Sequence, residues 1–96
     1  MEVKVEDLKK GDEILSSCYT DVVYLRILQD PRPHKTAKRY DGTPYYLNIK
    51  CEVNKKIIPT KYGHTTKYSC TPIDEGTGTV VRKNLNGRVM WLLNRK

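Results

Sequence analysis

A chain of 96 residues, of which 38% are hydrophobic and 30% charged, predicts one small soluble domain over residues 1–96 with a compact core. No stretch approaches the roughly 20 apolar residues that span a bilayer, and the opening segment MEVKVEDLKKGDE lacks the apolar core of a secretory signal. We therefore expect a cytoplasmic protein with no membrane partner.

The net charge of +7 is unevenly distributed along the chain. Residues 1–31 carry four Lys or Arg and seven Asp or Glu, a balance of −3. Residues 32–67 carry nine and two, a balance of +7, and residues 68–96 carry five and two, a balance of +3. A basic middle third attracts nucleic acid, anionic headgroups or acidic proteins, and charge alone does not choose among them.

The first half of the chain predicts two short strands and then a loop. We expect strands near residues 12–17 and 21–29, because β-prone residues there alternate between the two faces of a strand. Residues 31–44 have no apolar periodicity and predict a long loop, which in a small domain is often functional. Prolines at positions 31, 33, 44, 59 and 72 disfavour any long helix.

The clearest strand is predicted at residues 45–53. Alternation assigns one set of side chains to the core face, namely Tyr45, Leu47, Ile49, Cys51 and Val53. It assigns the other set to the exposed face, namely Tyr46, Asn48, Lys50 and Glu52. A further short strand is expected near residues 67–71, and a turn near residues 74–78.

The last predicted unit is a hairpin with strands near residues 79–85 and 88–94. Asn86-Gly87 favours a type I′ turn, which needs positive φ at both central residues. The expected register pairs Leu85 with Arg88, Lys83 with Met90, Arg82 with Trp91 and Val81 with Leu92. The single tryptophan, Trp91, is then expected in the core of this hairpin.

Five or six short strands in a chain of this length predict an all-β fold, a small antiparallel barrel that ends in a C-terminal β-hairpin. The segment DLKKGDEI, residues 7–14, resembles the entry to the first strand of SH3-like barrels, including the KOW-type domains of transcription and translation proteins. The resemblance implies an SH3-like barrel and is confined to this segment, so no functional residue is carried over from it. The OB-fold is the competing barrel, and the prolines disfavour the helix that it usually contains.

The sequence gives little support for catalysis or for a cofactor. The acidic pairs Asp12-Glu13 and Asp74-Glu75 stand beside glycines in predicted turns, where they are expected as solvated charges. No phosphate-cradling loop or nucleophile elbow is present in the sequence. We therefore expect a protein that is not an enzyme and has no cofactor.

The three cysteines predict neither disulfides nor a metal site. An odd number of widely spaced cysteines without a secretory signal indicates free thiols at Cys18, Cys51 and Cys70. The closest pair of zinc-ligand types, His64 and Cys70, is separated by five residues, whereas zinc sites usually begin with a pair such as C-x₂-C. We expect no bound metal.

Basic residues interleaved with tyrosines predict a nucleic-acid-binding loop and sheet face within residues 32–67. Lys and Arg pair with phosphates, and tyrosine rings stack on bases. The predicted contact residues are Arg32, Lys35, Lys38, Arg39, Tyr40, Tyr46, Lys50, Lys55, Lys56, Lys61, Tyr62 and Lys67. The simpler interpretation is a solvated basic loop, with tyrosine as the aromatic core residue of a chain without Phe.

A protein-binding adaptor or inhibitor that acts on an acidic or host protein is the alternative function. Nucleic-acid binding weakens steeply with salt because bound counterions are released. A protein interface depends more on a central apolar or aromatic anchor, for which an exposed Trp91 would be the candidate. The sequence alone does not distinguish DNA from RNA.

Overall fold

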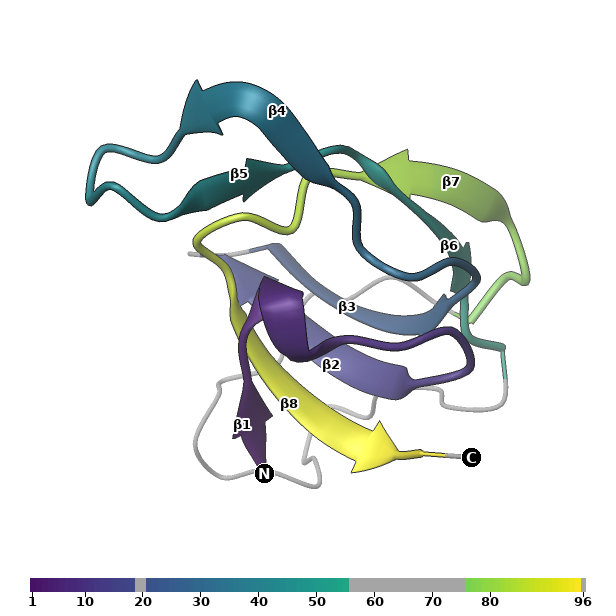
Figure 1. The fold of residues 1–96 in the computed structure, drawn as a ribbon. Helices are drawn as coiled ribbons and strands as arrows, with labels where there is room; N and C mark the ends of the chain where they lie inside the picture. The colour runs from purple at the N-terminus through teal and green to yellow at the C-terminus, as the bar shows by residue number, and fades with distance from the viewer. Residues whose placement is uncertain (19–20, 56–75, 96) are drawn as a thin grey trace.

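The computed structural model describes residues 1–18, 21–55 and 76–95. The regular structure in these ranges is almost entirely β, which confirms the predicted all-β class (Figure 1). One turn of 3-10 helix, η1 (Val5–Asp7), lies near the N-terminus, and no helix in the described ranges is long and apolar enough to cross a membrane. The strands are β1 (Glu2–Val3), β2 (Glu13–Cys18), β3 (Asp21–Ile27), β4 (Pro33–Lys38), β5 (Pro44–Tyr46), β6 (Ile49–Val53), β7 (Val80–Lys83) and β8 (Val89–Asn94).

Six of these strands form one antiparallel sheet in the order β1-β8-β2-β3-β6-β7. The strands β4 and β5 form a separate two-stranded sheet, a hairpin that projects from the main sheet (Figure 1). In the described part of the chain β1 and β7 are the edges of the main sheet, and the strand pairs do not close it into a barrel. The structure therefore supports an antiparallel all-β fold and shows no closed barrel among the described strands.

The main core lies on one face of the six-stranded sheet. Alternation along β2, β3 and β6 directs Ile14, Leu25 and Cys51 to this face, where all three are fully buried. The opposite face carries a smaller apolar cluster, which consists of Leu15, Val22, Tyr24 and the half-buried Trp91. Trp91 pairs with Leu15 across β8 and β2, so the tryptophan packs on the outer face of the main sheet.

The prediction of a C-terminal β-hairpin is wrong. The turn exists, since the Arg88 N–H donates to the Leu85 carbonyl at 3.4 Å and Gly87 has a φ of 72°. The strands β7 and β8 do not pair with each other, because β7 pairs with β6 and β8 pairs with β1 and β2. Leu85 explains the difference: it is 1% exposed, so the turn is drawn into the core and the two strands leave it toward different partners. The actual partners include Lys50 for Arg82, Cys51 for Val81, and Glu2 and Leu15 for Trp91.

The prediction of a long loop at residues 31–44 is also wrong, because most of this segment forms the β4–β5 hairpin. Hydrophobic alternation detects a strand by its buried face. Every residue of β4 except Ala37 is exposed, so this strand has almost no buried face to produce the pattern. A strand pair that is open to solvent on both sides therefore looks like a loop in the sequence.

The strand predicted at residues 45–53 is broken into β5 and β6. Ile49, Cys51 and Val53 are buried as predicted. At the N-terminal end the predicted faces are wrong, since Leu47 is 42% exposed and Tyr46 packs against the main core. The break lies between Tyr46 and Ile49, and it reverses the phase of the alternation because the side-chain period of a strand is two.

Of the two acidic pairs predicted as solvated turn residues, Asp12-Glu13 is buried, and Asp74-Glu75 lies outside the described residues. Asp12 is 1% exposed, and its carboxylate accepts bonds from Arg95 Nε at 3.0 Å, Arg95 Nη2 at 2.9 Å and the Lys9 N–H at 2.9 Å. Glu13 is 7% exposed and accepts from Asn54 Nδ2 at 2.5 Å. Buried carboxylates need such partners, so Asp12 and Glu13 hold chain segments together.

Candidate nucleic-acid interface

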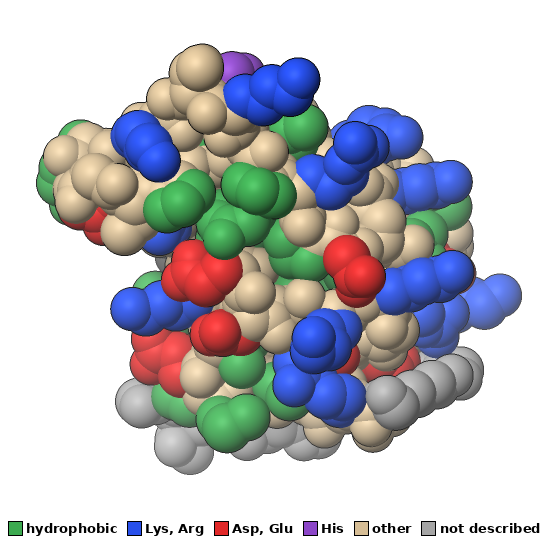
Figure 2. Space-filling view, in the orientation of Figure 1, with side chains coloured by type: hydrophobic (Ala, Val, Ile, Leu, Met, Phe, Trp, Pro, Cys, Tyr) green, Lys and Arg blue, Asp and Glu red, His purple; other side chains and the backbone are tan. Residues whose placement is uncertain are grey.

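The β4–β5 hairpin carries the first group of predicted contact residues. Arg32, Lys35 and Lys38 are all exposed, in or directly beside β4. Tyr40 lies in the turn at the hairpin tip and is fully exposed, at 105% of its reference area. Figure 2 shows Lys and Arg side chains on the hairpin and along the side of the molecule where β6 and β7 lie, with acidic side chains below the hairpin. One projecting element thus presents three cations and an aromatic ring.

The hairpin tip is shaped by backbone bonds and by one carboxylate. The Arg39 N–H donates to the Thr43 carbonyl at 2.8 Å, and Gly42 adopts a φ of 87° that favours glycine. The Asp41 carboxylate accepts from the Thr43 N–H at 3.0 Å and from the Thr43 hydroxyl at 2.6 Å. These two bonds and the nearby Arg39 lower the pKa of Asp41, so it is ionised at neutral pH.

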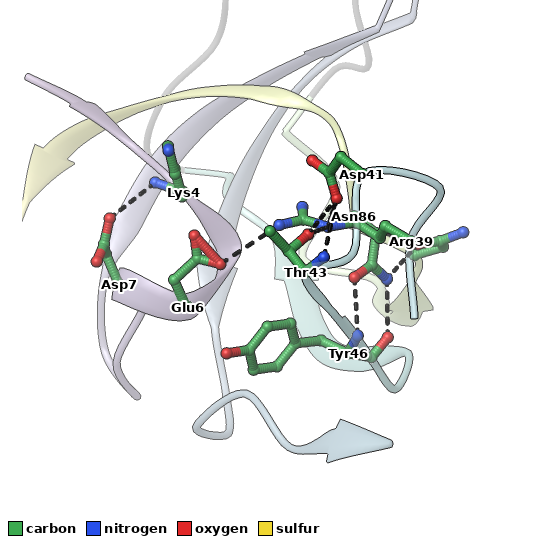
Figure 3. A network of polar contacts seen from close by, with 9 residues as sticks. Lys4, Glu6, Asp7, Arg39, Asp41, Thr43, Tyr46 and Asn86 are labelled. Atoms are coloured by element: carbon green, nitrogen blue, oxygen red, sulfur yellow. Dashed lines mark hydrogen bonds and ion pairs between the residues drawn. The ribbon is translucent and has the colours of Figure 1, made fainter. Parts of the chain in front are cut away.

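Arg39 holds the hairpin tip against the N-terminal segment. Its Nη2 lies 3.6 Å from Glu6 Oε2 of η1, and its Nε donates to Thr43 Oγ1 and lies 4.0 Å from Asp41 Oδ1 (Figure 3). The Arg39 side chain is only 18% exposed. Arg39 was predicted as a phosphate contact; in the structure its Nε donates to Thr43 and its guanidinium faces Glu6 and Asp41, which ties the hairpin tip to η1.

A second tie joins the hairpin base to the turn between β7 and β8. Asn86 Oδ1 accepts from the Tyr46 N–H at 2.8 Å, and Asn86 Nδ2 donates to the Tyr46 carbonyl at 2.8 Å (Figure 3). Asn84 fixes this amide, because its Oδ1 accepts from the Asn86 N–H at 3.1 Å and from Asn86 Nδ2 at 2.7 Å. Tyr46, predicted as an exposed stacking residue, is therefore half-buried and serves the fold.

Between the hairpin tip and the β7–β8 turn lies a groove of about 500 Å³. Its lining consists of Lys38, Arg39, Tyr40, Asp41, Tyr45, Asn84, Asn86 and Gly87. A smaller hollow of about 300 Å³ shares Arg39, Asp41 and Gly87 with it and adds the carboxylates of Glu2 and Glu6. The smaller hollow also adds the cations Lys4 and Arg88, so charge does not separate the two. The larger groove is the better candidate for a nucleic-acid ligand because its lining includes the exposed Tyr40 and Lys38.

The remaining described cations lie on the main sheet. Lys50 of β6 and Arg82 of β7 are exposed and directly opposite each other. Gln29 Oε1 accepts from the Lys50 N–H at 3.1 Å and from Arg82 Nη1 at 3.2 Å, which steadies this pair of cations. Lys55 is exposed just after β6. The other predicted contacts lie outside the described residues, as do the strand expected at 67–71, His64 and Cys70; these contacts are Lys56, Lys61, Tyr62 and Lys67.

Three residues of this region were missed by the sequence reasoning, namely Arg82, Asn84 and Asn86. The Asn86-Gly87 pair was recognised as a turn, but nothing in its spacing shows that the side chain reaches Tyr46, 40 positions away. Arg82 was assigned to the wrong strand partner. The sequence shows the charge of Arg82 but does not show that Arg82 lies opposite Lys50 in the sheet.

The described residues offer little else for chemistry. No group of three or more His, Cys, Asp or Glu side chains in residues 1–18, 21–55 and 76–95 lies close enough to hold a metal ion. Burial raises the pKa of the Cys51 thiol to about 12, so this thiol is protonated and unreactive at neutral pH.

Comparisons with known proteins give no relative from which to transfer a function: the chain matches no protein-family model, no curated protein and no solved structure.

Proposed function

We propose that this protein is a non-catalytic nucleic-acid-binding module whose main contact surface is the β4–β5 hairpin. One observation carries the proposal: three exposed cations, Arg32, Lys35 and Lys38, share a single projecting hairpin with the fully exposed ring of Tyr40. Cations whose side chains donate to no other described residue are available to phosphates, and an exposed ring is available to a base.

The charges that neutralise this surface are few. On the hairpin itself the described acidic residue is Asp41, whose carboxylate is bonded to Thr43 and lies near Arg39. Glu6, from η1, also faces Arg39. These two carboxylates therefore offset Arg39, and no described carboxylate forms an ion pair with Lys35 or Lys38. Lys50 and Arg82 extend the positive surface onto the main sheet.

We propose further that the main sheet is related to the SH3-like barrel that residues 7–14 resemble. The supporting observation is the uninterrupted order β8-β2-β3-β6-β7. Its two end strands, β7 and β8, are joined by the short segment 84–88, so the ends of the five-strand run are tethered close together. Small barrels of this kind present loops and hairpins from a rigid sheet, which suits a binding module.

A charge-matched pair of variants tests the proposed function. The hairpin variant carries Arg32→Ala, Lys35→Ala and Lys38→Ala, and the control carries Lys4→Ala, Lys9→Ala and Lys10→Ala, which removes the same net charge from exposed positions near the N-terminus. Affinity for fluorescent DNA and RNA oligonucleotides is measured by anisotropy at several salt concentrations. The hairpin variant is expected to bind more weakly and to lose about 0.7–0.9 units of salt slope per lost phosphate contact.

The control variant is expected to change affinity much less than the hairpin variant. Equal losses in the two variants would show that only net charge matters and would contradict the assignment of the hairpin. Absence of any binding by the wild-type protein at low salt would overturn the proposed function.

The alternative, a protein-binding adaptor or inhibitor, has one observation in its favour. Val89 and Leu93 of β8 are 41% and 43% exposed, and Val89 lies on the same strand face as the half-buried Trp91. An apolar strip beside a tryptophan is typical of a protein interface. Association with a partner that persists after nuclease treatment and at high salt, and that a Leu93→Ala variant weakens, would favour this function.

A further inference from the structure

We propose that the groove between the hairpin tip and the β7–β8 turn accepts one unpaired nucleobase, so that the protein prefers single strands to duplexes. The inference rests on the proposed function and names the form of nucleic acid that the site takes. The volume of about 500 Å³ lies within the range of roughly 300–1,000 Å³ that is typical of sites for small molecules.

The charges in the groove suit a base better than a phosphate. Arg39 lines the groove, but its guanidinium is held by Glu6, Asp41 and Thr43. Asp41 also lines the groove and is ionised at neutral pH. The interior is therefore close to neutral, and a phosphate placed there would meet the Asp41 carboxylate. Lys38 is the exposed cation among the described lining residues, and it would hold a phosphate at the mouth of the groove.

The aromatic residue that would stack on the base is Tyr40. Tyr40 is fully exposed and is one of the residues that line the groove, together with the half-buried Tyr45. A fully exposed ring keeps both of its faces free for a ligand. Base–aromatic stacking in complexes with single strands is sequence-tolerant, and loss of the ring lowers affinity by roughly 5- to 150-fold per base.

Asn84 supplies a hydrogen-bond donor for the edge of the base. Its Oδ1 already accepts two bonds from Asn86, which fills both acceptor positions of that oxygen and fixes the orientation of the amide. Its Nδ2 donates to no other described residue, and Asn84 is exposed in the groove lining. Since every base carries an acceptor, a site that offers a donor accepts all four bases. We therefore expect little sequence preference.

A duplex fits this arrangement poorly. The faces of paired bases are stacked and their Watson–Crick edges are occupied, so a base reaches Tyr40 and Asn84 only if it leaves the stack. Extrusion of a base from a duplex requires unpairing and unstacking, which a single strand does not require. The phosphate contacts of Lys35 and Lys38 are available to both forms, so the groove is the feature that separates them.

The test uses the full chain and three probes of equal length: single-stranded DNA, single-stranded RNA and duplex DNA. Affinity is measured by anisotropy at one low salt concentration for the wild type and for Tyr40→Ala, Tyr40→Phe and Asn84→Ala. The matched control is Leu47→Ala, which truncates another exposed apolar side chain beside the hairpin but outside the groove lining. Circular dichroism confirms that each variant is folded.

The wild type is expected to bind one or both single strands at least tenfold more tightly than the duplex. Tyr40→Ala is expected to lose roughly 5- to 150-fold of single-strand affinity while duplex affinity changes little. Tyr40→Phe keeps the ring and is expected to bind as the wild type does, and Leu47→Ala likewise.

Two failures are distinguishable. If no probe binds at low salt, the proposed function fails and this inference fails with it. If the duplex binds as tightly as the single strands, or if Tyr40→Ala binds single strands like the wild type, the nucleobase groove is contradicted while the phosphate-binding hairpin stands.

Discussion

The side chain of Asn86 replaces a strand partner for Tyr46. Its Oδ1 and Nδ2 form hydrogen bonds of 2.8 Å each with the N–H and the carbonyl of Tyr46, as the backbone of a neighbouring strand does in a sheet. The residue that shapes the β7–β8 turn therefore also fixes the base of the β4–β5 hairpin. In this way one amide connects the two elements that line the groove.

Replacement of Asn86 by Ala is expected to destabilise the protein by about 1–3 kcal/mol, because the part-buried N–H and carbonyl of Tyr46 lose their partners. Urea unfolding followed by circular dichroism measures the change. Asn48→Ala, at an exposed position just after β5, is the control and is expected to change stability by less than about 0.5 kcal/mol. Equal stability of the Asn86 and Asn48 variants would contradict the bridging role.

Replacement of Arg39 by Lys is expected to weaken nucleic-acid binding without changing its salt slope. Lysine keeps the charge but has no Nε donor for Thr43 and no planar fork for Glu6 and Asp41, so the hairpin tip loses its hold on η1. The measurement is the salt dependence of affinity. Arg39→Ala removes the charge and serves as the second variant, with Lys38→Ala as its comparison. If both lower the salt slope of binding by the same amount, Arg39 contacts phosphate directly.

Asn54 is expected to be a strong stability determinant through Glu13. Asn54 is fully buried and donates from Nδ2 to the buried carboxylate of Glu13, which also accepts from Asn94 Nδ2 at 3.1 Å. Asn54→Ala removes a bond to a charged group and should cost about 1.5–3 kcal/mol, measured by chemical unfolding. An unchanged affinity for nucleic acid in the same variant would separate this structural network from the binding surface, whereas a stability equal to that of the wild type would refute its structural role.

We expect the folded protein to lose stability at alkaline pH because of the buried thiol of Cys51. Burial raises the pKa of its thiol in the folded state from 9.0 to about 12. Between these values the unfolded chain releases the proton and the folded chain keeps it, so the free energy of unfolding falls as pH rises from about 9 toward about 12. Well below pH 9 the thiol is protonated in both states and contributes no pH dependence.

A variant with Cys18→Ser and Cys70→Ser isolates this thiol. At pH 8 its remaining thiol is expected to react with a thiol reagent only as fast as the protein unfolds, and to react at once in denaturant. Alkaline melts of this variant and of one that also carries Cys51→Ala should diverge above pH 9. Immediate labelling of the native protein would show that Cys51 is accessible.

Sequence reasoning was most successful where a strand has one buried face. Ile49, Cys51 and Val53 follow the predicted alternation because β6 lies over the core. The predictions are wrong where a strand has no buried face and therefore no hydrophobic alternation. The exposed strand β4 looked like a loop, and the break after Tyr46 reversed the assigned faces.

The sequence predicts which residues of the candidate site are charged, but it does not predict which residues they contact. Lys35, Lys38 and Tyr40 could be selected from the sequence as a cluster of cations with a tyrosine, but their exposure is known from the structure alone. Arg39 differs from these residues because it forms an ion pair with Glu6, which lies far earlier in the chain. The groove likewise depends on residues of the β7–β8 turn. Such long-range pairings cannot be read from local periodicity, and a strong turn signal misled the strand pairing at Asn86-Gly87.

The most direct test of the proposed contact surface is a titration of the isotope-labelled protein with a short single-stranded oligonucleotide, followed by the chemical shifts of its backbone amides. The largest changes are expected in the β4–β5 hairpin, from Arg32 to Tyr40, and in the β7–β8 turn at Asn84 and Asn86. No change at low salt, or changes confined to Val89 and Leu93 of β8, would contradict the account.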